Sequence, residues 1–331
     1  MKITRREFVT ATTTLLAANL LYGQQTNAKK IVIILAPSNL GLRPNENGTQ
    51  QGTWRAPEAL MEAGLKKALN PIEVIALDRP KYEVDAQSGT RIRNGNTIRT
   101  FTLQLSEKIT GILKQNQFPV VIGGDCSILL GGLYASRLAG GRGLIHIDGH
   151  ADFSHPGNYD TASRLGSAAG MDLALASGRG EDLLTDWPKI GKPLANDADI
   201  IQIGERNAES QYYKDYYGDI LSTEIKMFKI QSILADGIKT TAQKVIARLE
   251  ERNLNKIWVH VDLDVLDEKV MPAVDSPGSP GLNYEQLSEL IAALCNSGRI
   301  AGINFAIYDP ERDPQKRYAG PLVKCIANAL R

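Results

Sequence analysis

The chain has 331 residues, 43% hydrophobic and 23% charged, which is typical of a globular protein with a substantial core. Lysine and arginine total 38 against 37 aspartate and glutamate residues, so bulk charge favours neither nucleic acid nor an acidic membrane surface as a partner. Three cysteines are too few and too scattered for a disulfide framework or a zinc ribbon. No apolar run reaches the roughly 18 residues of a membrane span.

Residues 1–28 have the composition of an export signal. Arg5 and Arg6 precede the apolar Phe8, a weakly apolar stretch extends to about Gly23, and a polar segment ends at Ala28. This arrangement resembles a twin-arginine signal, which carries folded proteins across a membrane. The alternative, an amphipathic first helix of the mature fold, would need a 3.6-residue apolar stripe that this stretch lacks. We therefore expect export, to the periplasm, with cleavage near Ala28.

Residues 29–331 alternate short β-branched apolar runs with amphipathic segments. Strands are expected at Ile31–Leu35, Ile72–Leu77, Pro119–Ile122, Gly143–Ile147, Ile200–Ile203, Ile225–Phe228, Ile257–Val261 and Ile300–Ile303. Helices are expected at Ala56–Leu69, Thr97–Lys114, Ser127–Leu138, Thr240–Arg252, Tyr284–Leu294 and Pro314–Leu330. Strands that are apolar on both faces and separated by helices form mostly parallel sheets covered on both sides. The pattern predicts one α/β domain over residues 29–331.

Histidines and aspartates gather at the ends of two expected strands. The segments are His146-Ile147-Asp148-Gly149-His150-Ala151-Asp152 and His260-Val261-Asp262-Leu263-Asp264. Residues two apart on a strand share a face, and open parallel sheets bind ligands at the carboxyl ends of their strands. Clustered carboxylates are costly to bury without cations, so the pattern predicts a site for a divalent ion such as Mn²⁺. The alternative is that Asp148 and Asp262 cap helices while His146 and His260 are core residues.

A third strand end carries Gly123-Gly124-Asp125-Cys126-Ser127. Paired glycines let the backbone approach a neighbour closely, and Asp125 or Ser127 can cap the following helix. Cys126 is either a small buried hydrophobic residue or a metal ligand, and the sequence leaves both possibilities open.

The motifs GGDCS at Gly123–Ser127, DGHAD at Asp148–Asp152 and VDLDVLD at Val261–Asp267 together resemble the ureohydrolase superfamily of arginases, agmatinases and formiminoglutamases. The resemblance extends from about Ile31 to the C-terminus. It implies a three-layer αβα sandwich around an eight-stranded, mostly parallel sheet. It also implies two Mn²⁺ ions bridged by a hydroxide that attacks a guanidinium or amidine carbon.

The resemblance also implies a ligand set for the two ions. Asp148 and Asp262 would bridge both ions, with His150 and Asp264 completing one shell and Asp152 and Cys126 the other. Asp152 would in addition act in catalysis by accepting a hydrogen bond from the bridging hydroxide. Two dications make hydroxide available near neutral pH and stabilise the charge that develops on attack.

Three positions depart from the pattern of the superfamily. Cys126 stands where a metal-binding histidine is usual, which favours softer ions such as Ni²⁺ or Zn²⁺ if the thiol ligates. Ala169 replaces the histidine of the substrate loop, and Ile307 replaces a glutamate that clamps the guanidinium group. These losses argue against arginine bound in the familiar pose.

Three residues are candidates to compensate for these losses. They are His155 as a catalytic group and Asn304 and Asp309 as substrate-binding groups. The long polar loop from Phe153 to Gly166 follows the predicted metal ligands and is expected to set specificity.

Two functions remain open from the sequence. The first is a hydrolase, dependent on two divalent ions, that cleaves a C–N bond of a small guanidino, amidine or related substrate. The second is a non-catalytic metal-binding or ligand-sensing protein on the same fold. The resemblance also implies a homo-oligomer, since members of the superfamily commonly form trimers or hexamers.

Overall fold

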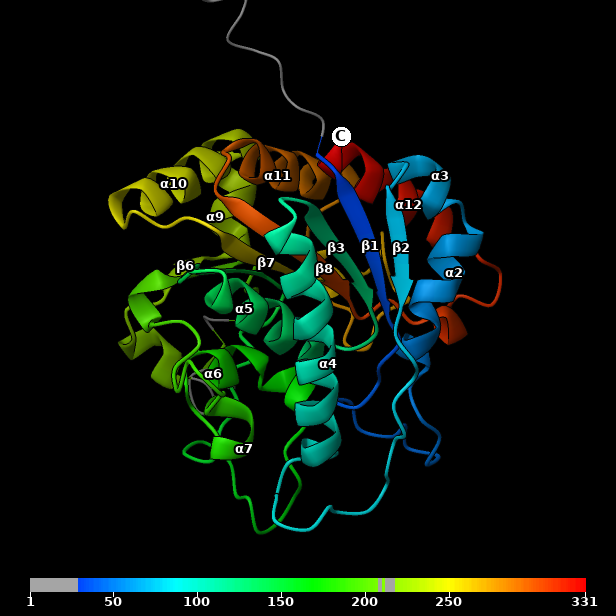
Figure 1. The fold of residues 1–331 in the computed structure, drawn as a ribbon, viewed down its shortest axis with the longest axis vertical. Helices are drawn as coiled ribbons and strands as arrows, with labels where there is room; N and C mark the ends of the chain where they lie inside the picture. The colour runs from blue at the N-terminus through cyan, green and yellow to red at the C-terminus, as the bar shows by residue number, and fades with distance from the viewer. Residues whose placement is uncertain (1–28, 208–209, 212–217) are drawn as a thin grey trace, which may run out of the picture.

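The structure, a computed structural model, describes residues 29–207, 210–211 and 218–331, so the export signal predicted at residues 1–28 lies outside the described residues. A single sheet has the strand order β2-β1-β3-β8-β7-β4-β5-β6, and all neighbouring strands pair in parallel (Figure 1). The strands are β1 (Ile31–Ala36), β2 (Glu73–Ala76), β3 (Phe118–Gly123), β4 (Leu144–Ile147), β5 (Ile200–Ile203), β6 (Lys226–Phe228), β7 (Ile257–Asp262) and β8 (Ile300–Ala306). The predicted eight-stranded parallel sheet is confirmed.

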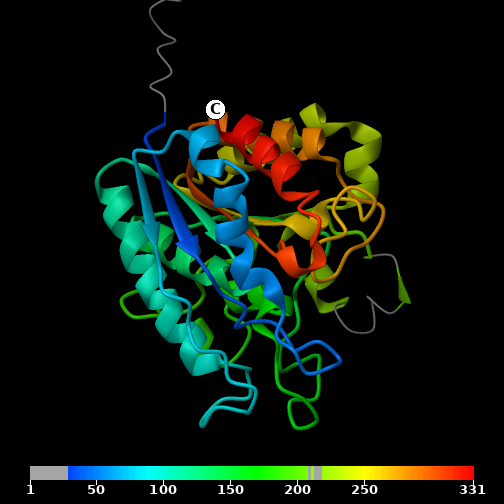
Figure 2. The same cartoon turned by 90° about the vertical axis from the view of Figure 1, so that its right-hand side faces the viewer.

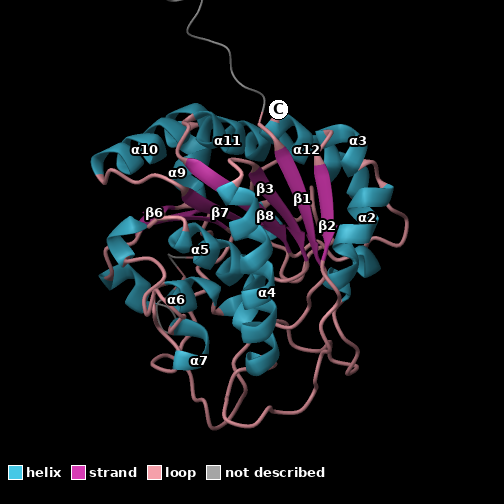
Figure 3. Cartoon of the chain, in the orientation of Figure 1, coloured by secondary structure: helices cyan, strands magenta, loops and turns pink. Residues whose placement is uncertain are grey.

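Helices cover both faces of this sheet (Figure 3). One layer consists of α2 (Ala56–Glu62), α3 (Leu65–Leu69), α9 (Ile230–Asp236), α10 (Ile238–Glu251), α11 (Tyr284–Asn296) and α12 (Ala319–Leu330). The opposite layer consists of α4 (Gly95–Lys114), α5 (Leu129–Leu138), α6 (Asp172–Ala176) and α7 (Asp182–Thr185). The turned view in Figure 2 shows α4 and α2 on opposite sides of β1, so the three-layer sandwich is confirmed. None of the helices in the described part of the chain is both long and apolar enough to cross a membrane.

Two expected helices differ from the observed ones. The helix expected at Ala56–Leu69 is interrupted because Gly64 has φ 98°, a left-handed conformation that ends α2 and precedes α3. The helix expected from Pro314 begins only at Ala319, since the Asp313 carboxylate accepts hydrogen bonds from the backbone of residues 317 and 318 in a turn. Both errors concern the start or continuity of a helix, and the sheet is unaffected.

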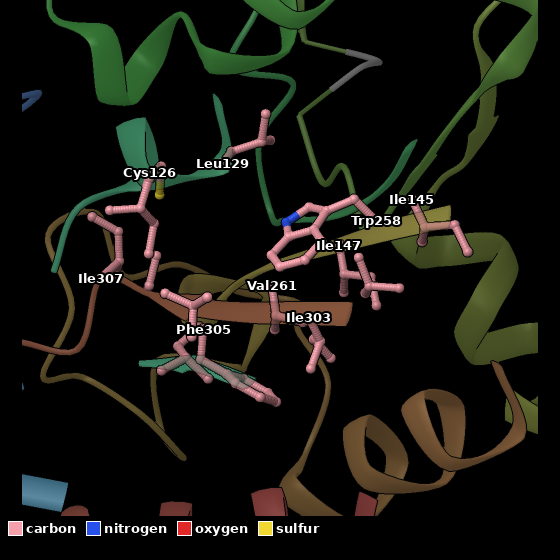
Figure 4. Packing of buried hydrophobic residues seen from close by; sticks show 14 of the residues in the cluster. Cys126, Leu129, Ile145, Ile147, Trp258, Val261, Ile303, Phe305 and Ile307 are labelled. Atoms are coloured by element: carbon pink, nitrogen blue, oxygen red, sulfur yellow. The ribbon is translucent and has the colours of Figure 1, made fainter. Parts of the chain in front are cut away.

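The centre of the sheet is a dense apolar cluster. Trp258 on β7 is fully buried, and Gly132 of α5 and Gly302 of β8 leave room for its indole ring. Figure 4 shows Trp258 within this cluster and Cys126 and Ile307 together at one end of it. The carboxyl ends of the central strands are therefore attached to tightly packed apolar residues, which hold the side chains beyond them in place.

Gly124, directly after β3, approaches the neighbouring backbone so closely that a Cβ atom would overlap the carbonyl oxygen of Ser38. We expect Gly124→Ala to lower the free energy of unfolding by about 1–3 kcal/mol, because backbone must move to admit the methyl group. Gly111→Ala is the matched control, since a Cβ there meets nothing within 4 Å. Denaturant unfolding of both variants measures the effect, and equal stabilities would contradict the expectation.

Candidate metal centre

The first group of predicted ligands follows β4. Asp148 is fully buried, and its backbone N–H donates to the carbonyl of Ile203 on β5 at 2.9 Å. The backbone N–H of His150 donates to Asp148 Oδ1 at 2.6 Å, which fixes the orientation of the carboxylate. Asp148 Oδ2 has no hydrogen-bond partner among the described residues. A fully buried carboxylate oxygen in this state is suited to a cation.

The second group follows β7, which pairs directly with β4 so that His146 lies opposite His260. At the end of β7, Asp262 Oδ1 accepts a hydrogen bond from the backbone N–H of Asp264 at 2.7 Å. Asp264 Oδ1 in turn accepts from the backbone N–H of Gly149 at 3.1 Å, which links the two strand ends. The adjacency predicted for the two motifs therefore follows from the strand order.

Cys126 is brought to the same place by the turn after β3. Asp125 fixes this turn by accepting hydrogen bonds from the backbone N–H of Ser127 at 3.1 Å, that of Gly41 at 2.9 Å and the hydroxyl of Ser38 at 2.6 Å. The Sγ atom of Cys126 consequently lies 2.7 Å from Asp262 Oδ2, within the cluster of carboxylates.

The six predicted ligands meet in space. One oxygen each of Asp148, Asp262 and Asp264 lie within 4.8 Å of one another, as do ligand atoms of Asp148, His150 and Asp152. Asp148 belongs to both groups. Cys126 forms a further group with Asp152, and the third member of that group is Asp172, which was not predicted.

Burial and repulsion between the carboxylates shift the pKa values of the clustered side chains. Burial raises the pKa values of Asp148, Asp152 and Asp262 well above the ordinary range, and the neighbouring carboxylates raise them further. Burial and the same carboxylates also raise the pKa of the Cys126 thiol. A bound divalent cation reverses these shifts because it favours the charged form of each ligand.

His150 and Asp264 form the ion pair of the cluster, with His150 Nδ1 at 2.8 Å from Asp264 Oδ2. Burial alone would lower the pKa of His150, but the charge and hydrogen bond of Asp264 raise it to about 9. Burial alone would raise the pKa of Asp264, but His150 and then Arg206 bring it below its usual value. Without a metal ion, His150 is therefore the cation that stabilises this carboxylate.

The donor set fits a pair of divalent ions. Arg206 is buried, and its guanidinium nitrogen Nη2 lies 4.0 Å from Asp264 Oδ1. Two dications together with Arg206 would balance the charge of five clustered aspartates. These are Asp148, Asp152, Asp172, Asp262 and Asp264. Carboxylates with one imidazole and one thiol suit borderline ions such as Mn²⁺, Ni²⁺ or Zn²⁺.

A cavity of about 490 Å³ opens beside the ligands. Its wall includes Cys126, Ala169 and Ile307, the three positions that depart from the pattern of the superfamily, and also Asp152. The predicted specificity loop contributes Ser154, Tyr159, Arg164 and Gly166 to the same wall. The cavity is therefore bounded by the metal ligands on one side and by that loop on another.

Two of the cavity residues have a left-handed backbone, Asp152 with φ 44° and Ile307 with φ 77°. This conformation is rare for a β-branched residue, and it costs on the order of 1–3 kcal/mol. The backbone N–H of Ile307 donates to the carbonyl of Gly124 at 2.6 Å, which holds the end of β8 against the end of β3. Ile307 therefore presents a fixed apolar wall to the cavity.

None of the three residues predicted to compensate, His155, Asn304 and Asp309, lines the cavity. The His155 ring contacts the carboxylate of Asp219 instead. Asn304 is fully buried within the sheet layer, where its amide bonds the side chains of neighbouring β7 residues. Asp309 is engaged in a turn, where it accepts from the backbone N–H groups of Gly52 at 3.1 Å and of residue 311 at 2.9 Å.

Two cavity carboxylates were missed at the sequence level, Glu205 and Asp275. Glu205 follows β5, and its Oε1 accepts from the backbone N–H of Asn207, whereas its Oε2 has no partner among the described residues. Burial raises the pKa of Glu205 to about 7. The rule applied to β4 and β7, polar residues at the carboxyl end of an apolar strand, would have identified Glu205 as well.

Comparison with known proteins agrees with this geometry. Residues 29–330 match the sequence pattern of the arginase family. The arginase of Staphylococcus aureus (strain COL) is 28% identical over 315 residues, covering 91% of this chain and 97% of that protein. Human arginase-1 is 25% identical over 292 residues, covering 86% of each chain. The crystal structure of arginase from Bacillus cereus superposes with a TM-score of 0.76 at 26% identity, over 91% of this chain and 98% of the other. From its three motifs, its eight-stranded sheet and this match over nearly the whole described length, the chain belongs to the arginase family.

Proposed function

We propose that the protein is a metal-dependent hydrolase that cleaves a C–N bond of a small guanidino or amidine compound. The observation that carries this proposal is the convergence of five aspartates, His150 and Cys126 at the edge of a cavity. The relatives support the reaction class, since they include arginases and, among the solved structures, a formimidoylglutamase from Bacillus subtilis with TM-score 0.67 at 18% identity.

Two divalent ions, which we propose are Mn²⁺ with Ni²⁺ or Zn²⁺ as alternatives, would supply a nucleophile from water near neutral pH and stabilise the charge that develops on the substrate. Asp152 lines the cavity from the ligand cluster, so its carboxylate is placed to orient the attacking water and to hold its proton. The water oxygen then bonds to the amidine carbon, the C–N bond breaks, and the departing nitrogen takes up the proton.

The wall of the cavity suggests how a cationic substrate is held without a glutamate at position 307. Ile307 and Ala169 offer no charge, whereas Glu205 is among the lining residues and its buried Oε2 has no hydrogen-bond partner in the described part of the chain. A carboxylate oxygen without a partner can accept a hydrogen bond from an amidinium or guanidinium group, and the negative charge of the carboxylate complements the positive charge of that group. We therefore propose that Glu205 binds the substrate cation.

A substrate panel tests the reaction class. Purified protein, stripped of metal and reloaded with Mn²⁺, Ni²⁺ or Zn²⁺ in turn, is assayed for urea, ammonia or formamide release from guanidino and amidine compounds. We expect turnover of at least one compound and none without a divalent ion. Absence of turnover with every ion and every compound would favour the second function, a non-catalytic metal-binding protein, which the loss of polar groups at positions 169 and 307 motivates.

Glu205→Gln separates substrate binding from chemistry. We expect KM for the cationic substrate to rise about 10-fold or more, corresponding to the roughly 1.5–3 kcal/mol of a charged hydrogen bond, with kcat nearly unchanged. Steady-state kinetics at fixed metal concentration measures both constants. Glu311→Gln is the control, since Glu311 pairs with Arg55 away from the cavity. An unchanged KM for Glu205→Gln would show that another group holds the cation.

Export through residues 1–28 and assembly into a homo-oligomer stay predictions from the sequence. We propose both for the mature protein, with a small-molecule substrate as its partner.

A further inference from the structure

Behind the predicted ligands lies a second polar cluster that consists of Asp172, His146 and His260. All three residues are fully buried, and ligand atoms of the three lie within 4.8 Å of one another. The two imidazole rings stack with their centroids 5.1 Å apart. Buried polar groups in an apolar core are costly unless they have a partner or a ligand, so this cluster needs an explanation.

Hydrogen bonds fix the state of His260. The indole N–H of Trp258 donates to Asn304 Oδ1 at 2.8 Å, which turns the amide nitrogen of Asn304 toward His260 Nδ1 at 2.7 Å. Since an amide NH₂ group only donates, Nδ1 of His260 must accept. The neutral ring therefore carries its proton on Nε2, which faces Asp172 Oδ2 at 3.4 Å. This N–H lies near the Asp172 carboxylate without forming a hydrogen bond to it, and it leaves Nε2 of the neutral ring unavailable to bind an ion.

His146 approaches the other oxygen of the same carboxylate. Its Nε2 lies 3.1 Å from Asp172 Oδ1 and 3.6 Å from Asp148 Oδ2. Each oxygen of Asp172 therefore faces one imidazole nitrogen, with a hydrogen bond to His146 on one side and a longer contact to His260 on the other. Metal-binding carboxylates are commonly oriented by hydrogen bonds of this kind from groups that do not touch the ion.

Asp172 also lies beside two of the predicted ligands. Cys126 Sγ, an oxygen of Asp152 and an oxygen of Asp172 lie within 4.8 Å of one another, a spacing that an ion with bonds of about 2.0–2.3 Å spans. Asp172 Oδ2 has no hydrogen-bond partner among the described residues. The thiol of Cys126 and the carboxylates of Asp152 and Asp172 therefore provide three potential ligands for one ion.

We propose that Asp172 is a metal ligand that joins Cys126 and Asp152 around one ion, and that His146 and His260 orient it. The ion on this side of the cluster then has a sulfur ligand and an additional carboxylate, so it is chemically distinct from the ion near His150. A borderline divalent ion such as Zn²⁺ or Co²⁺ suits this subsite best. This inference rests on the proposed function only in that both require divalent ions.

Titration with Co²⁺ alone tests the inference without an activity assay. For the unmodified chain we expect two equivalents to bind, with near-ultraviolet sulfur-to-cobalt charge-transfer absorption that Cys126→Ser abolishes. In Asp172→Asn we expect this absorption to require at least about 10-fold more Co²⁺, because one ligand charge is lost. His260→Gln should produce a smaller shift in the same direction. Asp309→Asn, a buried aspartate outside the cluster, should titrate like the unmodified chain.

Equal Co²⁺ titrations of Asp172→Asn and the unmodified chain would overturn the inference. Anomalous scattering from Co²⁺-soaked crystals of the unmodified chain gives a second answer that does not require the variant to fold. An Asp172 oxygen within about 2.0–2.2 Å of a cobalt peak supports the assignment, and a separation beyond about 3 Å refutes it. Weakened Co²⁺ binding without any amidine turnover would refute the proposed function alone, whereas turnover with unaltered Co²⁺ binding would refute this inference alone.

Discussion

Asp148→Asn is expected to remove most bound metal and to reduce turnover strongly. Loss of a residue that hydrogen-bonds to a metal ligand lowers metal affinity or activity by roughly 10- to 100-fold, and loss of a ligand itself should have a larger effect. Asp148 shares ligand groups with Asp262 and Asp264 on one side and with His150 and Asp152 on the other, so one substitution affects both ions. Metal content by elemental analysis and turnover under metal-replete conditions measure the two effects.

The same variant has a second expected property that distinguishes a ligand from a structural residue. Burial and neighbouring carboxylates raise the pKa of Asp148, so its charge destabilises the protein when no ion is bound. We therefore expect metal-free Asp148→Asn to melt at or above the temperature of the metal-free unmodified chain near pH 7. Unchanged metal content and turnover, or a large loss of stability without metal, would contradict the proposed role.

Metal removal is expected to destabilise the unmodified chain by an amount that grows with pH. At a hundredfold excess over Kd, each ion adds roughly 2.7 kcal/mol of stability, so the loaded protein should melt higher by about 5 °C or more near pH 8. Ions compete with protons for the same carboxylates, so the difference in Tm should shrink toward pH 5. Thermal melts of loaded and stripped protein between about pH 5 and pH 8 measure this difference.

The direction of this pH dependence follows from how burial shifts the pKa values in the metal-free protein. Asp148, Asp152 and Asp262 have pKa values raised by burial and repulsion, so their stabilising protons are present at low pH and are lost as pH rises through the folded-state values. His146 and His260 act oppositely, because burial lowers their pKa values to about 3 and about 4, so their contribution is lost as pH falls below the unfolded value. The three carboxyl groups with raised pKa values outnumber these two histidines, so we expect the metal-free protein to lose stability as pH rises.

Asp148→Asn again provides the control, since its melting temperature should respond little to added ions at any pH. A difference in Tm between loaded and stripped protein that stayed constant or widened toward pH 5 would show that the ions do not bind at these carboxylates.

The sheet was predictable because β-branched runs that are apolar on both faces have few alternatives to a buried parallel strand. The exact ends of the strands were harder to predict. β8 continues beyond its predicted end at Ile303 to Ala306, because the side-chain amide of Asn304 forms hydrogen bonds with Trp258 and His260. A cross-strand contact of this kind depends on strand order, which local sequence does not contain.

The clustering of the predicted metal ligands could be expected for a different reason. Each lies at or just beyond the end of a predicted strand, and in a parallel sheet the ligand-binding residues gather at that edge. Asp172 and Asp275 lie in connecting segments, whose paths depend on tertiary contacts. A single signal pointed to Asp172, namely one carboxylate in the apolar stretch Ala168–Ala176. Asn304 on β8 and Asp309 in the following turn do not line the cavity, because their partners in neighbouring segments depend on tertiary contacts that local sequence does not contain.

The pairing of β4 with β7 has a consequence for the order of maturation. Cys126 and Asp262 are 136 positions apart in the chain, and they meet only when the central strands have assembled. An extended polypeptide thus cannot bring the predicted ligands of three strand ends together, and the tertiary scaffold must exist before the full set does. We therefore expect metallation to be a late event, so that purified protein refolded in the presence of a chelator acquires its ions afterwards without unfolding again.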